Sequence, residues 1–272
     1  MNDIFSMEFN PTQGEELWVA ARKNTHYREF VPCRALQPYV VCYWVSKTDS
    51  FNNQAIESRI IPDGCMDIVF NMTEIEKGKG GLICGLMTSP EVMIVKEVRE
   101  FIGIRFWPAG IIPFLGYSAA DFRDQLIPME DILGKNALDI SEKIGNVKRI
   151  EEQIMLIEEW LKNLLPHVQE INPFIKNVLL AIYRDKGIIS VKKLSEELNI
   201  SQRHLSRKFN EWVGANAKTF SNIIRFQNTI HQLNQRNHID YLEIALNNGY
   251  YDQAHFIKEF KYLYGKTPSQ FK

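Results

Sequence analysis

The apolar positions of the chain follow two different periods. Between residues 39 and 107, short β-branched and aromatic runs alternate with turn residues, which is typical of strands. The predicted strands lie near residues 39–45, 59–61, 66–70, 82–86, 92–95 and 100–107. Asp63-Gly64 separates two of these runs and favours a hairpin turn. With short helices expected at 110–115 and 118–123, residues 1–145 are predicted to form a small β-barrel or sandwich.

A helical period begins near residue 147. Apolar residues recur there at steps of 4, 3, 4 and 3, which predicts an amphipathic helix over 146–165 with a heptad-like stripe. The stripe consists of Ile150, Ile154, Ile157, Leu161 and Leu164. Two alternatives stay open: the stripe packs on its own barrel, or it pairs with a second subunit. Pro166 ends the helix, and residues 166–172 are expected to be a linker.

Residues 173–272 have the pattern of an all-α domain. Ser190 and Ser201 are predicted N-caps of two successive helices with a tight turn at Asn199 between them. Leu205 and Phe209 lie on one side of the second helix, and the opposite side is polar and basic. This arrangement is typical of a helix-turn-helix whose second helix reads a major groove. The outward residues are Gln202, Arg203, Ser206, Arg207 and Asn210.

The same arrangement occurs again near the C-terminus. Asp240 begins a helix, Gly249 makes the turn, and Asp252 begins a second candidate reader helix. Its outward residues are Gln253, Ala254, Lys258 and Lys261, and His255 either reaches DNA or lies at the edge of this face. Residues 217–235 form the predicted connecting helix of ~30 Å, close to one ~34 Å turn of B-DNA. One chain could therefore place two reader helices in successive major grooves.

These residues resemble a known family. Residues 194–209 (LSEELNISQRHLSRKF) and 244–272 (IALNNGYYDQAHFIKEFKYLYGKTPSQFK) resemble the two helix-turn-helix units of the AraC/XylS transcription regulators. The resemblance implies a sequence-specific DNA-binding regulator. The base-reading positions that it implies are Arg203, Ser206 and Arg207, followed by Gln253, Ala254, His255 and Lys258. Family members usually have Phe near Tyr250 or Tyr251 and Arg at the position of Lys258, so the second DNA element is less defined.

A second resemblance covers the N-terminal region. Residues 36–44, 61–67, 103–110 and 121–133 resemble an uncharacterised domain that occurs ahead of AraC-type DNA-binding modules. A cupin-like sensing barrel is usual at that place, so the resemblance implies control by a small-molecule effector or another signal. The fold class expected is therefore α+β with two domains, a cupin-like β-barrel or sandwich followed by an all-α domain.

Charge separates the two regions. The 272 residues carry a net charge of −1, yet residues 171–272 hold 15 Lys and Arg against 8 Asp and Glu, and residues 1–170 hold 17 against 25. A basic region beside an acidic one indicates that only the former binds a polyanion, here double-stranded DNA, although surface charge can also divide by chance. Candidate phosphate contacts are Lys192, Lys193, Lys208, Lys261 and Lys266, each of which could instead be a solvated surface charge.

Composition excludes several function classes. The chain is 45% hydrophobic and 24% charged, as in folded proteins, and no apolar run is long enough for a membrane span. A cytoplasmic protein without membrane contact is expected. The four cysteines form no C-x-x-C pair, and His26 and His167 are the only imidazoles of residues 1–170, so neither a metal nor a cofactor is expected. An enzyme is not expected, although an unrecognised N-terminal activity, for instance at Cys33, is kept as an alternative.

Arg105 is the most unusual charge in the predicted strands, because it alternates with apolar neighbours in residues 101–107. Three interpretations are open: an ion pair with Asp63, Asp67 or Glu57, an anchor for an anionic effector, or an exposed side chain. Trp44 and Trp107 are candidate pocket residues beside Arg105, although large aromatic side chains are more often core.

The sequence therefore predicts a transcription regulator with an acidic sensing domain and a basic DNA-binding domain at 173–272. Its expected partners are double-stranded DNA and a small-molecule effector, with a second copy of the chain and RNA polymerase as further candidates. The main alternative within this class is a constitutive regulator whose N-terminal domain only dimerises.

Overall fold

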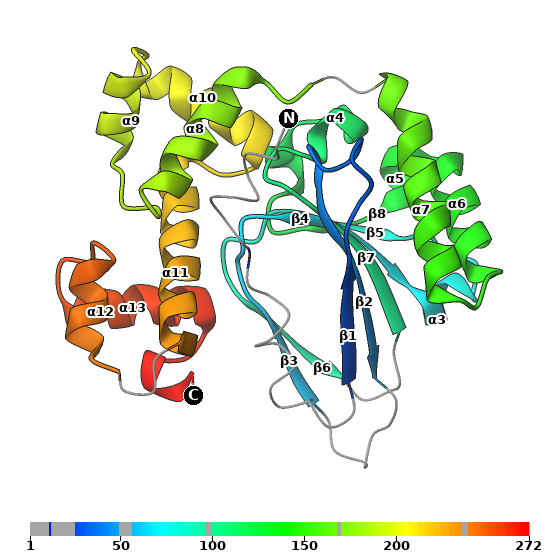
Figure 1. The fold of residues 1–272 in the computed structure, drawn as a ribbon, viewed down its shortest axis with the longest axis horizontal. Helices are drawn as coiled ribbons and strands as arrows, with labels where there is room; N and C mark the ends of the chain where they lie inside the picture. Colours follow the sequence, from blue (N-terminus) through cyan, green and yellow to red (C-terminus); the bar gives the residue numbers. More distant parts are fainter. Residues whose placement is uncertain are drawn as a thin grey trace.

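The computed structural model describes residue 11 and residues 25–48, 56–95, 100–167, 170–235 and 239–271. A β-sheet with covering helices forms the N-terminal domain (described residues up to 167), and a group of helices beside it forms the C-terminal domain (173–271) (Figure 1). This is the α+β class with two domains that the change of period predicts.

The main sheet has six strands in the order β1-β2-β7-β4-β5-β8, with antiparallel neighbours throughout. The strands are β1 (Thr25–Phe30), β2 (Val40–Thr48), β4 (Met66–Asn71), β5 (Leu82–Cys84), β7 (Glu100–Phe106) and β8 (Leu126–Pro128). A separate small sheet consists of β3 (Ile56–Ile60) and β6 (Glu91–Val95). Among the described strands, β1 and β8 each pair on one side only, so the main sheet is open, which fits the sandwich of the predicted barrel or sandwich and does not fit the barrel. The two sheets together are closer to a sandwich.

The hairpin predicted at Asp63-Gly64 is also wrong, because β3 pairs with β6 while β4 pairs with β5 and β7. Residues 61–65, here called the crossing loop, instead reach the C-terminal helix α11 (Ala217–Gln235) before β4 begins. Gly64 has φ of +86°, and a Cβ on it would lie 3.1 Å from the Phe220 ring. The left-handed backbone that favours a hairpin turn here allows close packing of the loop on a helix.

One face of the main sheet is covered by helices (Figure 1). Tyr43, Ile104 and Ile68 share a register row and are buried on this face, because side chains alternate along each strand. The helices of this domain are α3 (Met72–Ile75), α4 (Ile112–Leu115), η1 (Ala119–Phe122), α5 (Met129–Leu133), α6 (Lys135–Gly145), α7 (Ile150–Leu164) and η2 (Leu165–His167). Short helices were expected at the positions of α4 and η1.

Helix α7 carries the heptad-like stripe. Ile154, Ile157 and Leu161 are buried in the same core cluster as the sheet. The Tyr43 hydroxyl on β2 also donates to Glu158 Oε2 of α7 at 3.4 Å. The stripe therefore packs inside the chain, which is the first of its two predicted alternatives.

The C-terminal domain consists of α8 (Pro173–Arg184), α9 (Val191–Glu197), α10 (Gln202–Val213), α11, α12 (Tyr241–Asn247), α13 (Gln253–Tyr264) and η3 (Pro268–Gln270). The side chains of Asn172, Ser190, Ser201, Asp240 and Asp252 accept backbone N–H groups at the starts of their helices. The core of α8–α10 is continuous with that of the N-terminal domain, whereas α12 and α13 pack in a second cluster around Phe226. No described helix combines the length and apolar character that crossing a bilayer requires.

Candidate nucleic-acid interface

The first helix-turn-helix is formed by α9 and α10. Asn199 in the turn has φ of +50°, the left-handed backbone predicted for this position. Ser201 Oγ accepts from His204 N at 3.2 Å and so fixes the start of α10. The buried side of α10 consists of Leu205, Phe209 and Val213. Gln202, Arg203 and Arg207 are exposed on the other side, and Ser206 is half-buried beside them.

One residue predicted on this outer face and one predicted phosphate contact have partners elsewhere in the chain. Asn210 is half-buried, and its Oδ1 accepts a hydrogen bond from Nη2 of Arg123, which follows η1 in the N-terminal domain. Nζ of Lys208 lies 3.1 Å from both carboxylate oxygens of Glu211 on the same helix. The structure therefore directs Asn210 toward the N-terminal domain and Lys208 toward its own helix.

The second helix-turn-helix is formed by α12 and α13. Gly249 in its turn has φ of +70°, and Asp252 Oδ1 accepts from His255 N at 2.7 Å. The buried side of α13 consists of Phe256, Phe260 and Leu263. Gln253, Ala254 and Lys258 are exposed, as are Lys261 and the preceding Tyr251. Both units thus present a polar outer face from a helix with an apolar inner side.

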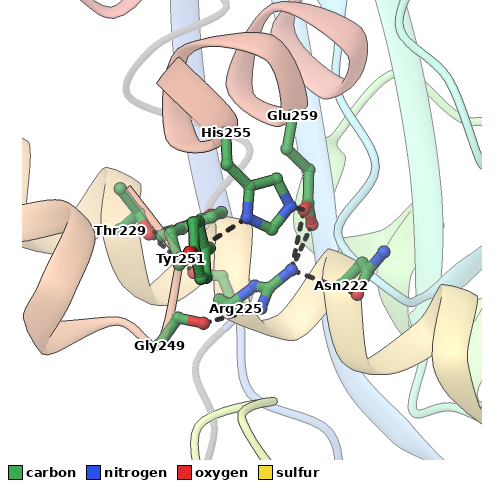
Figure 2. Close-up of polar contacts among 8 residues, drawn as sticks. Asn222, Arg225, Thr229, Gly249, Tyr251, His255 and Glu259 are labelled. Carbon is green, nitrogen blue, oxygen red and sulfur yellow. Dashed lines mark hydrogen bonds and ion pairs between the residues drawn. The ribbon is translucent and has the colours of Figure 1, made fainter. Parts of the chain in front are cut away.

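His255 is exposed, yet its ring is held on both edges (Figure 2). Nδ1 accepts from Tyr251 N at 3.2 Å, and Nε2 lies 3.1 Å from Glu259 Oε2 one turn further along α13. These contacts fit the imidazole tautomer that carries hydrogen on Nε2, because Nδ1 must accept. His255 therefore ties the turn before α13 to the helix itself.

Arg225 on α11 completes this network (Figure 2). Its Nη2 lies 2.7 Å from both carboxylate oxygens of Glu259, and its Nη1 donates to Gly249 O at 3.3 Å. The guanidinium carbon lies 4.4 Å from the centroid of the Tyr250 ring. Burial raises the pKa of the Tyr250 hydroxyl to about 12. One buried arginine thus joins the spacer helix to the turn and the reader helix of the second unit.

The two units sit at opposite ends of α11 (Figure 1). This helix has 19 residues, which correspond to about 28 Å at 1.5 Å per residue. Its observed bounds are those predicted. The spacing that the sequence indicates between the two units is therefore present as a single unbroken helix.

Exposed lysines lie on several elements of the C-terminal domain. Lys192 and Lys193 on α9 each have Nζ 3.8 Å from a glutamate one turn further along the helix, and both side chains remain largely exposed. Lys261 and Lys266 are exposed near the end of α13. Of the five lysines predicted to contact phosphate, Lys208 is the most covered.

Arg105 lies on the sheet face opposite the helices, in one register row with Cys42, Asp67 and Cys84. Its Nε is 3.6 Å from Asp63 Oδ2 and 3.5 Å from Asp67 Oδ1, and its Nη1 is 4.0 Å from Glu29 Oε1. Burial alone would lower the pKa of Arg105, but the carboxylates of Asp67 and Asp63 outweigh it and hold that pKa well above its ordinary value. This geometry matches the ion-pair interpretation. The Glu57 side chain lies outside the described residues.

The two predicted pocket tryptophans lie in different surroundings. Trp44 Nε1 donates to Asp67 Oδ2 at 3.0 Å, and its ring occupies the space left by Gly103, where a Cβ would overlap with it. Trp107 is buried in the main core, and its Nε1 donates to Gln37 O at 3.2 Å. The structure therefore brings Trp44 and Arg105 together at Asp67 and places Trp107 apart from that contact.

Within the described ranges, no group of three or more His, Cys, Asp and Glu side chains is arranged to hold a metal ion. Cys33, the candidate for an enzymatic alternative, is half-buried, and its backbone N–H donates to Glu158 Oε2 at 2.8 Å.

Three residues of these networks were missed in the sequence. Arg225 stands among Ile223, Ile224 and Phe226, so its apolar surroundings were a signal of the same kind that singled out Arg105. Glu259 and Arg123 carry no such local signal, because Arg225 lies 34 residues from Glu259 and Asn210 lies 87 residues from Arg123.

Comparison with known proteins follows the same division. Residues 194–272 match a family described as a helix-turn-helix domain, and residues 28–128 match a domain of unknown function. Uncharacterised helix-turn-helix transcriptional regulators of Staphylococcus aureus are 33% identical over 84 residues, which is 31% of this chain. The matched stretch spans only 11% of the length of those relatives.

Two solved structures show a distant likeness. The C-terminal domain of AraT, a response regulator from Geobacillus stearothermophilus, is 24% identical with a TM-score of 0.36, over 38% of this chain and 86% of that chain. ToxT from Vibrio cholerae is 14% identical with a TM-score of 0.40, over 91% of this chain and 96% of that chain.

Proposed function

We propose that this chain, in which residues 194–272 match a helix-turn-helix domain and residues 28–128 match a domain of unknown function, is a transcription regulator that binds specific sequences of double-stranded DNA. The reader helices are α10 and α13, which enter successive major grooves on one side of the duplex. The N-terminal domain controls this binding in response to a small molecule or another signal.

One observation carries the proposal. A polar, largely exposed helix face occurs twice, once at each end of the 19-residue helix α11. The length of α11 is close to one turn of B-DNA, so both faces can meet grooves of the same duplex. The basic charge of residues 171–272 supplies attraction to phosphate.

The proposed base-reading residues are those on the outer faces of α10 and α13, all of them exposed except the half-buried Ser206. In the first unit they are Gln202, Arg203, Ser206 and Arg207, and in the second Gln253, Ala254 and Lys258. Arg203 and Arg207 suit guanine, whose O6 and N7 accept from a guanidinium. Asn210 and His255 are assigned a positioning role. Oδ1 of Asn210 accepts from Arg123, and the two ring nitrogens of His255 contact Tyr251 N and Glu259. The phosphate contacts are Lys192, Lys193, Lys261 and Lys266.

Selection from a random duplex library by the purified full-length chain tests this function. We expect enrichment of a site with two elements about one helical turn apart. Arg207→Ala should cost about 1–3 kcal/mol of binding and relax the preference at one base. Arg149→Ala removes an exposed cation just before α7 and is the matched control. Binding without any sequence preference would contradict the proposal.

The signal acts through Arg105. The three ion-pair distances at its guanidinium are 3.5 to 4.0 Å, and its buried Nε has no hydrogen-bond partner within the described residues. An anionic effector that binds Arg105 competes with Asp63, which belongs to the crossing loop. Because Pro62 O of that loop accepts from Gln227 Nε2 on α11 at 2.8 Å, the competition reaches the DNA-binding domain.

Thermal unfolding in the presence of small carboxylates and phosphates tests the effector site. A ligand that binds only the folded state raises the melting temperature. We expect such a shift in the wild-type chain and its loss in Arg105→Lys, whose shorter cation lacks the planar fork that binds oxyanions. An equal shift in both proteins would place the ligand elsewhere.

Further partners are part of the same proposal. Transcription control in the cytoplasm involves RNA polymerase, and a second copy of the chain doubles the DNA elements that are read. Ile154, Ile157 and Leu161 of the α7 stripe are buried within the chain, so we propose that a homodimer uses another face. Sedimentation of the full chain with and without its selected duplex would show whether two copies bind.

A further inference from the structure

Each reader helix ends in a glycine with a left-handed backbone, and a segment of the N-terminal domain approaches each glycine. Gly214 ends α10 with φ of +91°, and Gly265 ends α13 with φ of +86°. A Cβ on Gly214 would lie 3.0 Å from Ala119 O, and one on Gly265 would overlap with the Arg59 guanidinium. Two separate segments of one domain thus approach the C-terminal ends of both reader helices.

At the end of α10 the contact is made by Arg123. Its Nε donates to Gly214 O while its Nη2 donates to Asn210 Oδ1. Ser118 Oγ adds a hydrogen bond to Glu211 O at 3.2 Å. The last carbonyls of a helix have no partner within the helix and carry partial negative charge, so a guanidinium is well matched to this end.

At the end of α13 the contact is made by Arg59 of β3. Its Nη1 donates to Tyr264 O at 2.6 Å, and its guanidinium carbon lies 5.3 Å from the centroid of the Tyr264 ring. The contact resembles that of Arg123, since a guanidinium again donates to a carbonyl at the end of a reader helix. The carbonyl belongs to the C-cap glycine in α10 and to the residue before that glycine in α13.

A third contact lies between these two. The crossing loop packs on α11, where Gln227 donates to Pro62 O at 2.8 Å and Gly64 faces Phe220 and Ile224. The N-terminal domain therefore touches the spacer helix and the ends of both reader helices. This gives the readers a second connection that does not run through α11.

From this geometry we propose that Arg123 and Arg59 are positioning residues for DNA recognition, which fix the separation and relative orientation of the two reader helices. The inference rests on the proposed function. Packing on α11 holds each reader at one place, and the two arginines attach the other end of each reader to a common domain. The chain consequently tolerates little variation in the spacing of its two DNA elements.

Binding of full-length protein to duplexes of graded spacing tests this inference. The two selected elements are moved apart or together by single base pairs, each of which shifts them by about 3.4 Å. We expect the DNA affinity of the wild-type chain to fall by about tenfold for each base pair of altered spacing. The affinity of Arg123→Ala and of Arg59→Ala should fall by about threefold for each base pair. Base preference within each element should stay unchanged. The loss of binding per step in Arg123→Lys and Arg59→Lys should lie between that of wild type and that of the alanine variants, because lysine can still donate to one carbonyl.

The outcomes separate the inference from the proposed function. If the alanine variants lose the same factor at every spacing, or keep the wild-type profile, the arginines do not set the spacing. If the wild-type chain selects no site with two elements, the proposed function fails, and the inference fails with it. Arg149→Ala should reproduce the wild-type profile, which controls for the loss of one cation.

Hydrogen exchange without DNA tests the contacts themselves. Arg123→Ala should speed amide exchange in the last turn of α10, and Arg59→Ala in the last turn of α13, each without effect on the other helix. Arg123→Lys and Arg59→Lys provide folded comparisons should an alanine variant unfold. Unchanged amide exchange in the last turns of α10 and α13, or equal acceleration throughout the C-terminal domain, would contradict the positioning role proposed for Arg123 and Arg59.

Discussion

Nη2 of Arg225 on α11 lies 2.7 Å from both carboxylate oxygens of Glu259 on α13. Both side chains are largely buried, with 5% and 12% exposure. The second reader helix is therefore attached to the spacer helix by a buried ion pair as well as by apolar packing. His255 and the turn at Gly249 and Tyr251 join the same pair, so the orientation of α13 depends on a residue outside its own unit.

Glu259→Ala should be strongly destabilising. It leaves the Arg225 guanidinium buried without its carboxylate, which typically costs about 3–5 kcal/mol of unfolding free energy. Urea unfolding of the full chain measures the loss. The double variant Arg225→Met/Glu259→Leu should lose less, because no unpaired charge remains buried. Equal losses in the single and double variants would show that the charge pair is not the cause.

Arg207 and Asn210 should differ in their effect on base preference. Arg207→Ala removes an exposed guanidinium, so it should relax the preference at one base pair. Asn210→Ala should leave every base preference intact, because the Asn210 carbonyl oxygen already accepts from Arg123. Sequence selection with each variant makes the comparison. A weaker preference at any base pair in the Asn210 variant would show that Asn210 contacts a base.

Lys261 and Lys208 should differ in the salt dependence of DNA binding. Each lysine that neutralises a phosphate adds about one to the slope of log affinity against log salt. Lys261 is exposed, whereas Nζ of Lys208 lies 3.1 Å from both oxygens of Glu211. We expect Lys261→Ala to lower the slope by about one and Lys208→Ala to leave it nearly unchanged. Fluorescence anisotropy at graded salt gives both slopes.

Asp67 should make stability depend on pH in an unusual direction. Burial raises the pKa of this carboxyl above its ordinary value. Between the unfolded value of about 4 and the raised folded value, the folded chain binds more protons, so the contribution of Asp67 to stability falls as pH rises. Asp67→Asn cannot ionise and should gain stability relative to wild type through this window. Urea unfolding of both proteins at graded pH should show that their difference in unfolding free energy changes with pH. A difference that is the same at every pH would contradict the raised pKa of Asp67.

Gly103→Ala should disturb the face of the main sheet that lies opposite the helices. A Cβ at this position would overlap with the Trp44 indole, whose Nε1 donates to Asp67 Oδ2 at 3.0 Å. Overpacking of this kind typically costs about 1–3 kcal/mol. Thermal unfolding measures the loss, and Trp44→Leu in the same chain should recover part of it. Failure of that second change to help would place the strain elsewhere.

The helices of the C-terminal domain could be predicted because their signals are short-range. Ser190 and Ser201 cap helices that begin one residue later, and Asn199 adopts the left-handed backbone expected of a tight turn. α11 has the predicted bounds, since its apolar period and its length are both local properties. The contacts that these helices make with distant segments of the chain carry no such short-range signal.

Strand pairing in the N-terminal domain shows the limit. The predicted strands lie close to β2 to β7, but the two edge strands β1 and β8 were not predicted, and the Asp63-Gly64 turn does not join β3 to β4. The partners of β4 are β5 and β7, and the choice depends on burial of alternating side chains across distant segments. The Asp-Gly pair predicts the left-handed backbone of Gly64, but it does not predict which strands pair on either side of the turn.

Adjacent residues of the crossing loop point to different domains, Asp63 to Arg105 and the Pro62 carbonyl to Gln227. Free-energy coupling between two binding events is reciprocal. A ligand that displaces Asp63 and thereby alters DNA affinity must itself be bound more tightly or more weakly, by the same factor, when the operator is occupied. Promoter DNA is then a regulator of the sensing domain in the same thermodynamic sense in which the small molecule is a regulator of the reader helices.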